Sequence, residues 1–404
     1  MSSAMMTMPR AAPAAPVVRG ARSASCRRAV SLKVRASGAA SSKPSVGKRE
    51  NMPQWSTDRP LPKDRKERID LKEGQRLIVT VPATSANMGP GFDSFGFAVD
   101  LENELIVERG NFEVKIEGEG ETTLPRDETN AIIKAVAAGY NAIYPDTPLP
   151  VKDLKFTSIN RIPTARGLGS SSAALVSGLA AGMALAGQDL SKPQSKQLLL
   201  QLAADAEGHP DNVAPAIYGG FQVSINTGAQ WVTQSIALPK GMQAVLFIPD
   251  FESLTAETRA ALPKMIPVAD AVFNISRAAM LINSFATGNM EALRYACQDV
   301  IHQPTRGAAF PMQELMDAAL SKGAHGAFLS GAGPTVLALT GGHGSDVNAD
   351  TMVTFLAVEV ADAMMDAAKA KGLAGRSVIS SPTPHGVRVT KKYAFTSSET
   401  GMWN

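Results

Sequence analysis

The sequence is poor in cysteine and in aromatic residues, with two cysteines and 5% Phe, Trp and Tyr among 404 residues. Cys26 falls in a basic N-terminal arm that we expect to be removed, so Cys297 would remain alone and an intrachain disulfide is excluded. Cys297 stands in a helical pattern of Met, Leu and Ala, where a buried thiol is far commoner than a nucleophile. We therefore predict a packing role for this cysteine.

Long hydrophobic runs are also absent from the chain. The longest one, residues 173–187, is shorter than the roughly 20 residues that cross a bilayer. Gly187 at its end suits the C-terminal cap of a helix. The run therefore predicts a buried helix and no association with a membrane.

The first 49 residues contain no Asp or Glu but carry ten Lys and Arg residues among Ala, Ser, Pro and Val. This composition, without the apolar core of a secretory signal, is typical of an organelle transit peptide. A basic nucleic-acid-binding tail is the alternative, although the arm lacks interleaved aromatic residues. We expect cleavage near residues 34–36, which makes residues 1–36 a transit peptide and residues 37–73 a linker.

The rest of the chain has a different charge balance from the basic arm. Outside residues 1–49, 30 basic residues face 37 acidic ones, so the formal net charge there is about −7, against +3 for the full chain. A mildly acidic chain is a poor partner for nucleic acid, and we expect none. About 340 residues remain after the arm and the linker, which is more than one compact core usually holds and predicts two lobes.

A glycine-rich stretch at residues 161–173, RIPTARGLGSSSA, lacks the lysine of a Walker loop but otherwise suits a phosphate site. Gly167 and Gly169 allow positive φ and a close approach of the backbone to an anion. Ser170, Ser171 and Ser172 then begin an Ala-rich helix, whose free amides and positive dipole end favour phosphate or its metal ion. A serine-capped helix after a flexible turn would have the same pattern.

Three further blocks lie far apart in the sequence, at residues 81–96, 207–221 and 330–335. Together with the glycine-rich stretch, they stand in the order and spacing of the GHMP kinases. Within that superfamily the chain resembles the homoserine kinase family, because of SANMGPGFD at residues 85–93 and HPDNVAP at residues 209–215. The resemblance covers residues 74–390 and points to a plastid form, because homoserine kinases of plants and algae are plastidial as a family.

Periodicity alone predicts a mixed α+β protein with a boundary between Asn226 and Lys240. The resemblance implies a two-lobed GHMP kinase fold, with an N-terminal lobe like ribosomal protein S5 domain 2 at residues 74–235 and a ferredoxin-like C-terminal lobe at residues 236–395. Residues 396–404 would form a tail. The expected strands are 77–81, 101–109, 112–117, 154–160, 242–249, 327–330, 336–340 and 386–390, with the last one in the second group. The expected helices are 130–143, 171–186, 196–206, 269–285, 290–297 and 350–371.

The resemblance implies that the protein uses ATP and Mg²⁺ to phosphorylate L-homoserine to O-phospho-L-homoserine in threonine biosynthesis. Ser171 and Glu207 would bind the metal ion, since Mg²⁺ prefers hard oxygen ligands. Asp205 is the competing acid. The expected ATP-binding residues are Pro163, Arg166, Gly167, Leu168, Gly169, Ser170, Ser171 and Ser172.

The substrate needs partners for an ammonium, a carboxylate and a hydroxyl group. Asn87 and Asp93 suit the amino and hydroxyl ends, and an arginine fork suits the carboxylate. The resemblance places Arg259, Arg306 and Thr255 near that carboxylate. His209, Asp211 and Asn212 would flank the hydroxyl, and the expected catalytic residues are Asn212, Asp93 and Glu207.

Asn212 stands where several other GHMP kinases have an aspartate, and an asparagine cannot act as a base at neutral pH. We therefore expect catalysis by positioning and charge stabilisation. Two alternatives stay open: a GHMP kinase for another small alcohol, and a catalytically silent GHMP-fold sensor. A homodimer also stays open.

Overall fold

The structure is a computed structural model that describes residues 69–253, 255–342 and 351–393 of the chain. The predicted transit peptide at residues 1–36, most of the predicted linker and the predicted tail lie outside the described residues. The linker ends earlier than expected. Ile69 and Leu71 are 9% and 2% exposed and belong to the main hydrophobic core. Arg109 donates hydrogen bonds to both of their carbonyl groups, so the folded region begins by residue 69.

The first sheet has the strand order β11-β1-β2-β4-β3, and β5 extends it by pairing with both β2 and β6. The pair β3 and β4 is parallel, and the other pairs are antiparallel. Its strands are β1 (Gln75–Ala86), β2 (Phe95–Arg109), β3 (Glu113–Gly118), β4 (Leu154–Asn160), β5 (Phe221–Asn226), β6 (Trp231–Ile236) and β11 (Arg388–Tyr393).

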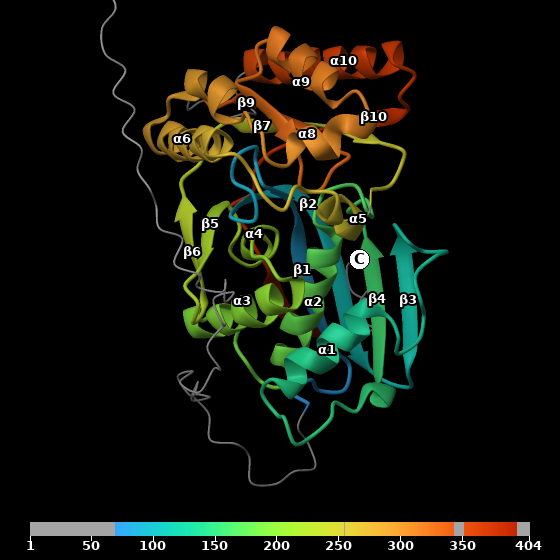
Figure 1. Ribbon diagram of the computed structural model, residues 1–404. Coiled ribbons are helices and arrows are strands. Elements are labelled where there is room, and N and C mark those ends of the chain that lie inside the picture. The colour runs from blue at the N-terminus through green and yellow to red at the C-terminus, as the bar shows by residue number, and fades with distance from the viewer. Residues whose placement is uncertain (1–68, 254, 343–350, 394–404) are drawn as a thin grey trace, which may run out of the picture. The chain divides into compact units, whose positions relative to one another are not determined.

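Strand β11 lies in the first sheet, antiparallel to β1, although it follows the second sheet in the sequence (Figure 1). Our assignment of residues 386–390 to the second group was therefore wrong. The cause is a long return of the chain, which no local pattern records. Just before this strand, Val387 donates its backbone N–H to the carbonyl of Ala216 and is itself 4% exposed.

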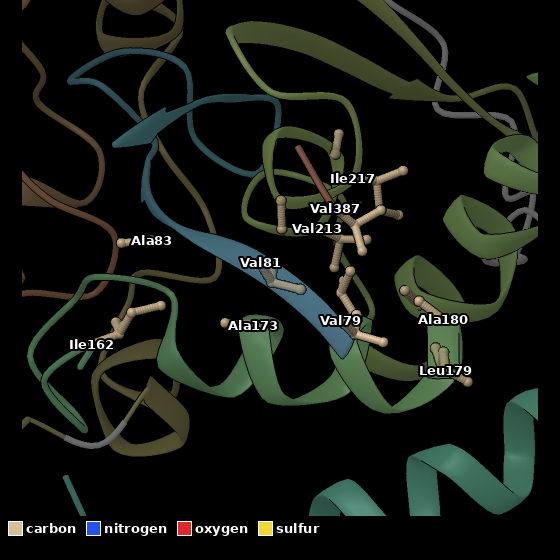
Figure 2. Packing of buried hydrophobic residues seen from close by; sticks show 14 of the residues in the cluster. Val79, Val81, Ala83, Ile162, Ala173, Leu179, Ala180, Val213, Ile217 and Val387 are labelled. Atoms are coloured by element: carbon tan, nitrogen blue, oxygen red, sulfur yellow. The ribbon is translucent and has the colours of Figure 1, made fainter. Parts of the chain in front are cut away.

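The helices of the first lobe pack on β1 and on one another (Figure 1). They are α1 (Ala131–Asn141), α2 (Ser170–Leu185), α3 (Pro193–Glu207) and α4 (Val213–Tyr218), with a 3-10 turn η1 (Val151–Asp153). Helix α2 is the apolar run of the sequence, and nearly all its residues beyond the first turn are buried. Figure 2 shows Val79 and Val81 of β1 among the side chains of α2 and α4, with Leu179 and Ile217 nearby.

The second sheet has the strand order β10-β7-β9-β8 and is antiparallel throughout. Helices α9 (Met312–Ser321) and α10 (Thr351–Ala370) pack on one face, where they share a core with Val245 and Phe247. The opposite face, with Leu246 and Leu337, joins the core of the first lobe. The strands are β7 (Met242–Pro249), β8 (Gly326–Leu329), β9 (Val336–Gly341) and β10 (Gly375–Ser380).

Several helices, of which α6 is the longest, connect β7 to α9. These are α5 (Thr255–Ala260), α6 (Val268–Thr287), the 3-10 turn η2 (Met290–Ala292), α7 (Leu293–Ala296), α8 (Gln303–Arg306) and the 3-10 turn η3 (Gly307–Ala309). Cys297 follows α7, and burial raises the pKa of its thiol to about 12, in agreement with the predicted packing role. In the part of the chain that the structure describes, none of the helices has the length and apolar content needed to cross a bilayer. The arrangement is the two-lobed α+β fold that the resemblance implied.

Helices α1 and α2 approach each other at three glycines, Gly139, Gly178 and Gly182. A Cβ atom at Gly182 would lie 2.0 Å from the carbonyl oxygen of Val136 and 2.6 Å from the backbone nitrogen of Tyr140. Because both neighbours are backbone atoms, they can move away only if the helices separate.

We therefore predict that Gly182→Ala lowers the free energy of unfolding by about 1–3 kcal/mol through overpacking, against the gain of about 1 kcal/mol from helix propensity. Urea denaturation of the purified chain measures the change. Gly187→Ala is the comparison, because the nearest atom to its Cβ would lie 3.9 Å away and only the positive φ of 84° opposes it. An unchanged or raised midpoint for Gly182→Ala would contradict the close approach.

Candidate active site

The glycine-rich loop ahead of α2 has the conformation that a phosphate site needs. Gly167 and Gly169 have φ values of 78° and 69°, and Gly169 is the N-terminal cap of α2. A Cβ atom at Gly167 would lie 2.2 Å from the carbonyl oxygen of Ser330, so no side chain fits there. No side chain caps the N-terminus of α2, so the backbone N–H groups of its first turn, from Ser170 onward, face an open loop.

The turn at residues 330–335 supports this loop. Ser330 Oγ donates to the carbonyl of Gly167 at 2.6 Å and lies 2.8 Å from Ser85 Oγ. The backbone N–H of Thr335 donates to the carbonyl of Arg166 at 3.3 Å. Contacts with both lobes therefore hold the loop in place. Gly167 and Gly169 of the loop also line a pocket.

One pocket brings together most of the residues that the sequence singled out. Its lining includes Asn87, Gly167, Gly169, Ser170, Ser171, Ser172, Glu207, His209, Asp211, Asn212, Arg259 and Arg306, together with Ala165, Ser253, Gly331 and Ala332. Asp93 does not line it but contacts Arg259. Thr255 is the first residue of α5, and its side chain lies outside the described residues.

Three of the expected ATP-binding residues do not line this pocket. Pro163 and Leu168 are buried. The side chain of Arg166 donates to the carbonyls of Pro249 and Asp250 at 2.9 and 2.6 Å, so it ties the loop to the end of β7. Its contribution at the loop is structural support.

Two hard oxygen ligands for a metal ion meet at the edge of the pocket. Glu207, the last residue of α3, accepts a hydrogen bond from Ser172 Oγ at 3.1 Å, and Ser171 Oγ lies 3.5 Å from the same carboxylate oxygen. Asp205, the competing acid, accepts a hydrogen bond from Trp231 Nε1 at 3.0 Å and does not line the pocket. A carboxylate and a hydroxyl beside a phosphate loop suit Mg²⁺, so Glu207 fits this ion and Asp205 does not.

Arg259, which lines the same pocket, forms an ion pair with Asp93. Arg259 Nη2 and Nη1 donate to the two carboxylate oxygens of Asp93 at 2.6 and 2.9 Å, a bidentate pair with side chains 40% and 32% exposed. The hydrogen bond to Asp93 is the main reason why the pKa of Arg259 is raised. Arg306 lies nearby, 7% exposed, and donates to the carbonyl of Gly331 at 3.1 Å. Burial lowers the pKa of Arg306, and the positive charge of Arg259 lowers it further.

The loop that carries Asp93 is held in an unusual conformation. Asn87, Met88 and Asp93 have φ values of 69°, 49° and 56°, which residues other than glycine rarely adopt. Asn87 compensates for this strain, because its Oδ1 accepts from the backbone N–H of Asp93 at 3.1 Å and its Nδ2 donates to the carbonyl of Gly331 at 2.9 Å. The amide of Asn87 therefore shapes the loop in this structure, in addition to lining the pocket.

Asn212 lines the same pocket just before α4, and its Oδ1 lies close to Gly169 of the phosphate loop. Thr84 Oγ1 donates to its Oδ1 at 2.8 Å, and its backbone N–H donates to Asp211 Oδ1 at 2.8 Å. The same oxygen of Asp211 lies 2.6 Å from His209 Nδ1. Burial disfavours the charged imidazole, but the hydrogen bond and the charge of Asp211 outweigh it, so the pKa of His209 is raised.

Thr84 is a residue of the site that the sequence analysis did not single out. It stands in the block at residues 81–96, but its hydroxyl became important only once the fold placed β1 beside Asn212. A Cβ atom at Gly169 would lie 2.0 Å from Thr84 Oγ1 and 3.1 Å from Asn212 Oδ1. The side chains of Thr84 and Asn212 therefore pack directly against the phosphate loop.

Comparisons with known proteins agree with this geometry. Residues 130–220 match the GHMP kinases N terminal domain, and residues 282–350 match the GHMP kinases C terminal domain. The chain is 38% identical over 313 residues to a homoserine kinase of Desulfitobacterium hafniense, covering 77% of this chain and 99% of that protein. It is 43% identical over 267 residues to a homoserine kinase of Moorella thermoacetica, covering 66% and 88% of the two chains.

Solved structures extend the likeness to the fold. A homoserine kinase from Cytophaga hutchinsonii superimposes with a TM-score of 0.66 at 26% identity, covering 78% of this chain and 97% of that one. A mevalonate kinase from L. major superimposes with a TM-score of 0.54 at 14% identity and covers 77% and 98% of the two chains, a likeness of fold alone. The chain therefore belongs to the homoserine kinase family of the GHMP kinases.

Proposed function

We propose that the protein is an ATP-dependent homoserine kinase, which transfers the γ-phosphate of ATP to the hydroxyl of L-homoserine and releases ADP. One observation carries this proposal: the pocket that the phosphate loop lines also includes Arg259, whose guanidinium forms a bidentate ion pair with Asp93. An amino acid carries an ammonium and a carboxylate on one carbon atom, which is the charge pattern that complements this pair. A neutral sugar or a simple hydroxy acid offers only part of that pattern.

In this proposal the triphosphate binds at the glycine-rich loop. The amides of residues 166–172 and the positive end of the α2 dipole stabilise its negative charge. The family uses ATP as the phosphoryl donor, and the hard oxygens of Ser171 and Glu207 would hold Mg²⁺. That ion neutralises phosphate charge when it is bound.

Asn212 would hold the substrate hydroxyl in line with the γ-phosphate. Its Oδ1 already accepts from Thr84, so its Nδ2 group is the part that can donate to the hydroxyl oxygen. No carboxylate stands at this position to remove the proton, and the nearest one, Asp211, accepts hydrogen bonds from Asn212 and contacts His209. The mechanism thus relies on positioning and charge, with the proton passing to phosphate or water as the bond forms.

We also propose that the protein acts in a plastid, as part of threonine biosynthesis. The support is the N-terminal composition, in which residues 1–49 contain ten basic and no acidic residues. A bacterial relative matched over 99% of its length pairs with only 77% of this chain, which leaves room for a segment outside the kinase fold.

A direct assay tests the activity and separates it from its alternatives. The full chain is incubated with ATP, Mg²⁺ and, one at a time, homoserine, mevalonate, galactose and shikimate, and products are identified by mass spectrometry. We expect phosphorylation of homoserine alone. Preferential phosphorylation of another alcohol would make it a different GHMP kinase, and binding without turnover would make it a sensor.

The charged pair makes a first prediction about specificity. Arg259→Ala should raise KM for homoserine and leave KM for ATP unchanged, because in this proposal the amides of residues 166–172 hold the phosphates. Loss of one charged hydrogen-bonding partner costs about 1.5–3 kcal/mol, or roughly one to two decades in kcat/KM. Arg76→Ala is the matched control, since Arg76 pairs with Glu108 at 2.8 Å and does not line the pocket. Equal losses for homoserine and for an alcohol without the carboxylate would remove Arg259 from this role.

The metal ligands make a second prediction. Glu207→Gln should raise the Mg²⁺ concentration needed for half-maximal activity by roughly tenfold or more, because the amide loses the negative charge that a hard cation prefers. Asp205→Asn, two residues away on the same helix, should leave the Mg²⁺ dependence unchanged. Titration of activity against Mg²⁺ at saturating ATP measures both. The reverse ranking of the two variants would assign the metal to Asp205.

A third prediction concerns the N-terminal arm. Deletion of residues 1–36 should leave the kinase activity unchanged and should stop a fused fluorescent reporter from entering plastids, because a transit peptide is read by the import machinery and then removed. Imaging of transformed plant cells and an assay of the purified truncated chain measure the two effects. Import without the arm would contradict the targeting proposal.

A further inference from the structure

Phe92 stands next to Asp93 in the loop between β1 and β2, and no step of the mechanism above uses it. Three side chains that can carry positive charge surround its ring. The Cζ atoms of Arg259 and Arg306 lie 5.4 and 5.2 Å from the ring centroid. The ring of His302 stacks on it, with centroids 5.3 Å apart and planes at 30°.

The position of this ring is fixed by the backbone around it. Gly89 has a φ of 79°, and a Cβ atom there would lie 2.1 Å from the carbonyl oxygen of Cys297. His302 Nε2 lies 2.8 Å from the carbonyl of Gly89, while Asp299 accepts from the backbone N–H of His302 at 2.9 Å. Residues 297–302 of the second lobe thus hold the loop, and with it the ring of Phe92.

The two arginines need such a neighbour, because both bring positive charge into the same partly buried region. Arg259 has Asp93 as its partner, but the side chain of Arg306 donates a single hydrogen bond among the described residues, to the carbonyl of Gly331 at 3.1 Å. Its Nε atom is buried and makes no hydrogen bond among the described residues. The negative face of an aromatic ring attracts a guanidinium within about 6 Å, most strongly where water is excluded.

We propose that Phe92 is a positioning residue of the substrate site, whose ring holds the guanidinium groups of Arg259 and Arg306 where both can meet the carboxylate of one amino acid. This inference rests on the proposed function and deepens it. Asp93, the partner for the ammonium, is the next residue in the chain. The loop therefore sets the spacing between the two charged ends of the substrate, with the ring acting through the arginines rather than on the reacting atoms.

Fluorination of the ring tests this role directly, since each fluorine weakens the negative face of the ring and changes its shape little. In the full chain, Phe92 is replaced by mono-, di- and trifluorophenylalanine, and steady-state kinetics are measured for homoserine and ATP. We expect KM for homoserine to rise stepwise with the number of fluorines, to about tenfold for the trifluoro ring. KM for ATP and kcat should stay within twofold.

Two controls separate electrostatics from packing. Phe112 also has a cation beside its ring, since Lys152 Nζ lies 5.0 Å from the ring centroid, but it does not line the pocket. The same replacements at Phe112 should therefore leave both KM values unchanged. Phe92→Trp should retain a low KM for homoserine, and Phe92→Leu should raise it as much as the trifluoro ring does.

A KM for homoserine that does not respond to fluorination would overturn the proposal, whatever the effect of Phe92→Leu, because only packing would then remain. Equal rises of KM for homoserine and ATP would overturn it as well. The unmodified chain is measured first in the same assay. If it fails to phosphorylate homoserine, the proposed function itself is wrong, and that result is distinct from a fluorination series without effect.

Discussion

The contact between the phosphate loop and the turn at residues 330–335 is the constraint on which the rest of the site depends. Gly167 lies so close to the carbonyl of Ser330 that no side chain fits, and the hydroxyl of Ser330 ties the two segments together at 2.6 Å. One segment precedes α2 of the first lobe, and the other joins β8 to β9 of the second. These contacts join the two lobes beside the pocket, whose lining includes Gly167 from the first segment and Gly331 and Ala332 from the second.

The site combines partial charges with full charges. Around the phosphate loop, backbone amides and serine hydroxyls supply partial charges that cost little to bury once an anion binds. Asp93, Arg259 and Arg306 carry full charges, which lie close together because they share partners and an aromatic ring. Such a cluster is stable only when its members compensate one another. The strained loop at residues 87–93 is the element that brings them together, and the hydrogen bonds of Asn87 hold it in place.

Asn212 shows how a GHMP fold can keep the same architecture with a different acceptor chemistry. Its side chain is fixed by Thr84 from β1, and its backbone is fixed by Asp211, which also contacts His209. Thr84, Asp211 and His209 together therefore set the orientation of Asn212. Precision of this kind suits a reaction in which the protein orients the alcohol and stabilises charge, and in which proton transfer is left to the phosphate or the solvent.

The sequence by itself determined the parts of the protein whose signal is local. The apolar run ending at Gly187 became the buried helix α2, and GLGSSS became its N-terminal turn, because glycine conformations and helix starts depend on neighbours in the chain. Strands β5, β6 and β10 were not predicted. Strand β6 in particular buries none of its residues and lacks a strong apolar alternation. Only the tertiary structure could show that Glu207 lines the pocket while Asp205 contacts Trp231, because the two acids stand two residues apart on one helix and so point to different sides. It alone also decided that β11 returns to β1, that Thr84 orients Asn212 and that Phe92 lies beside two arginines, because each of these contacts joins residues far apart in the chain.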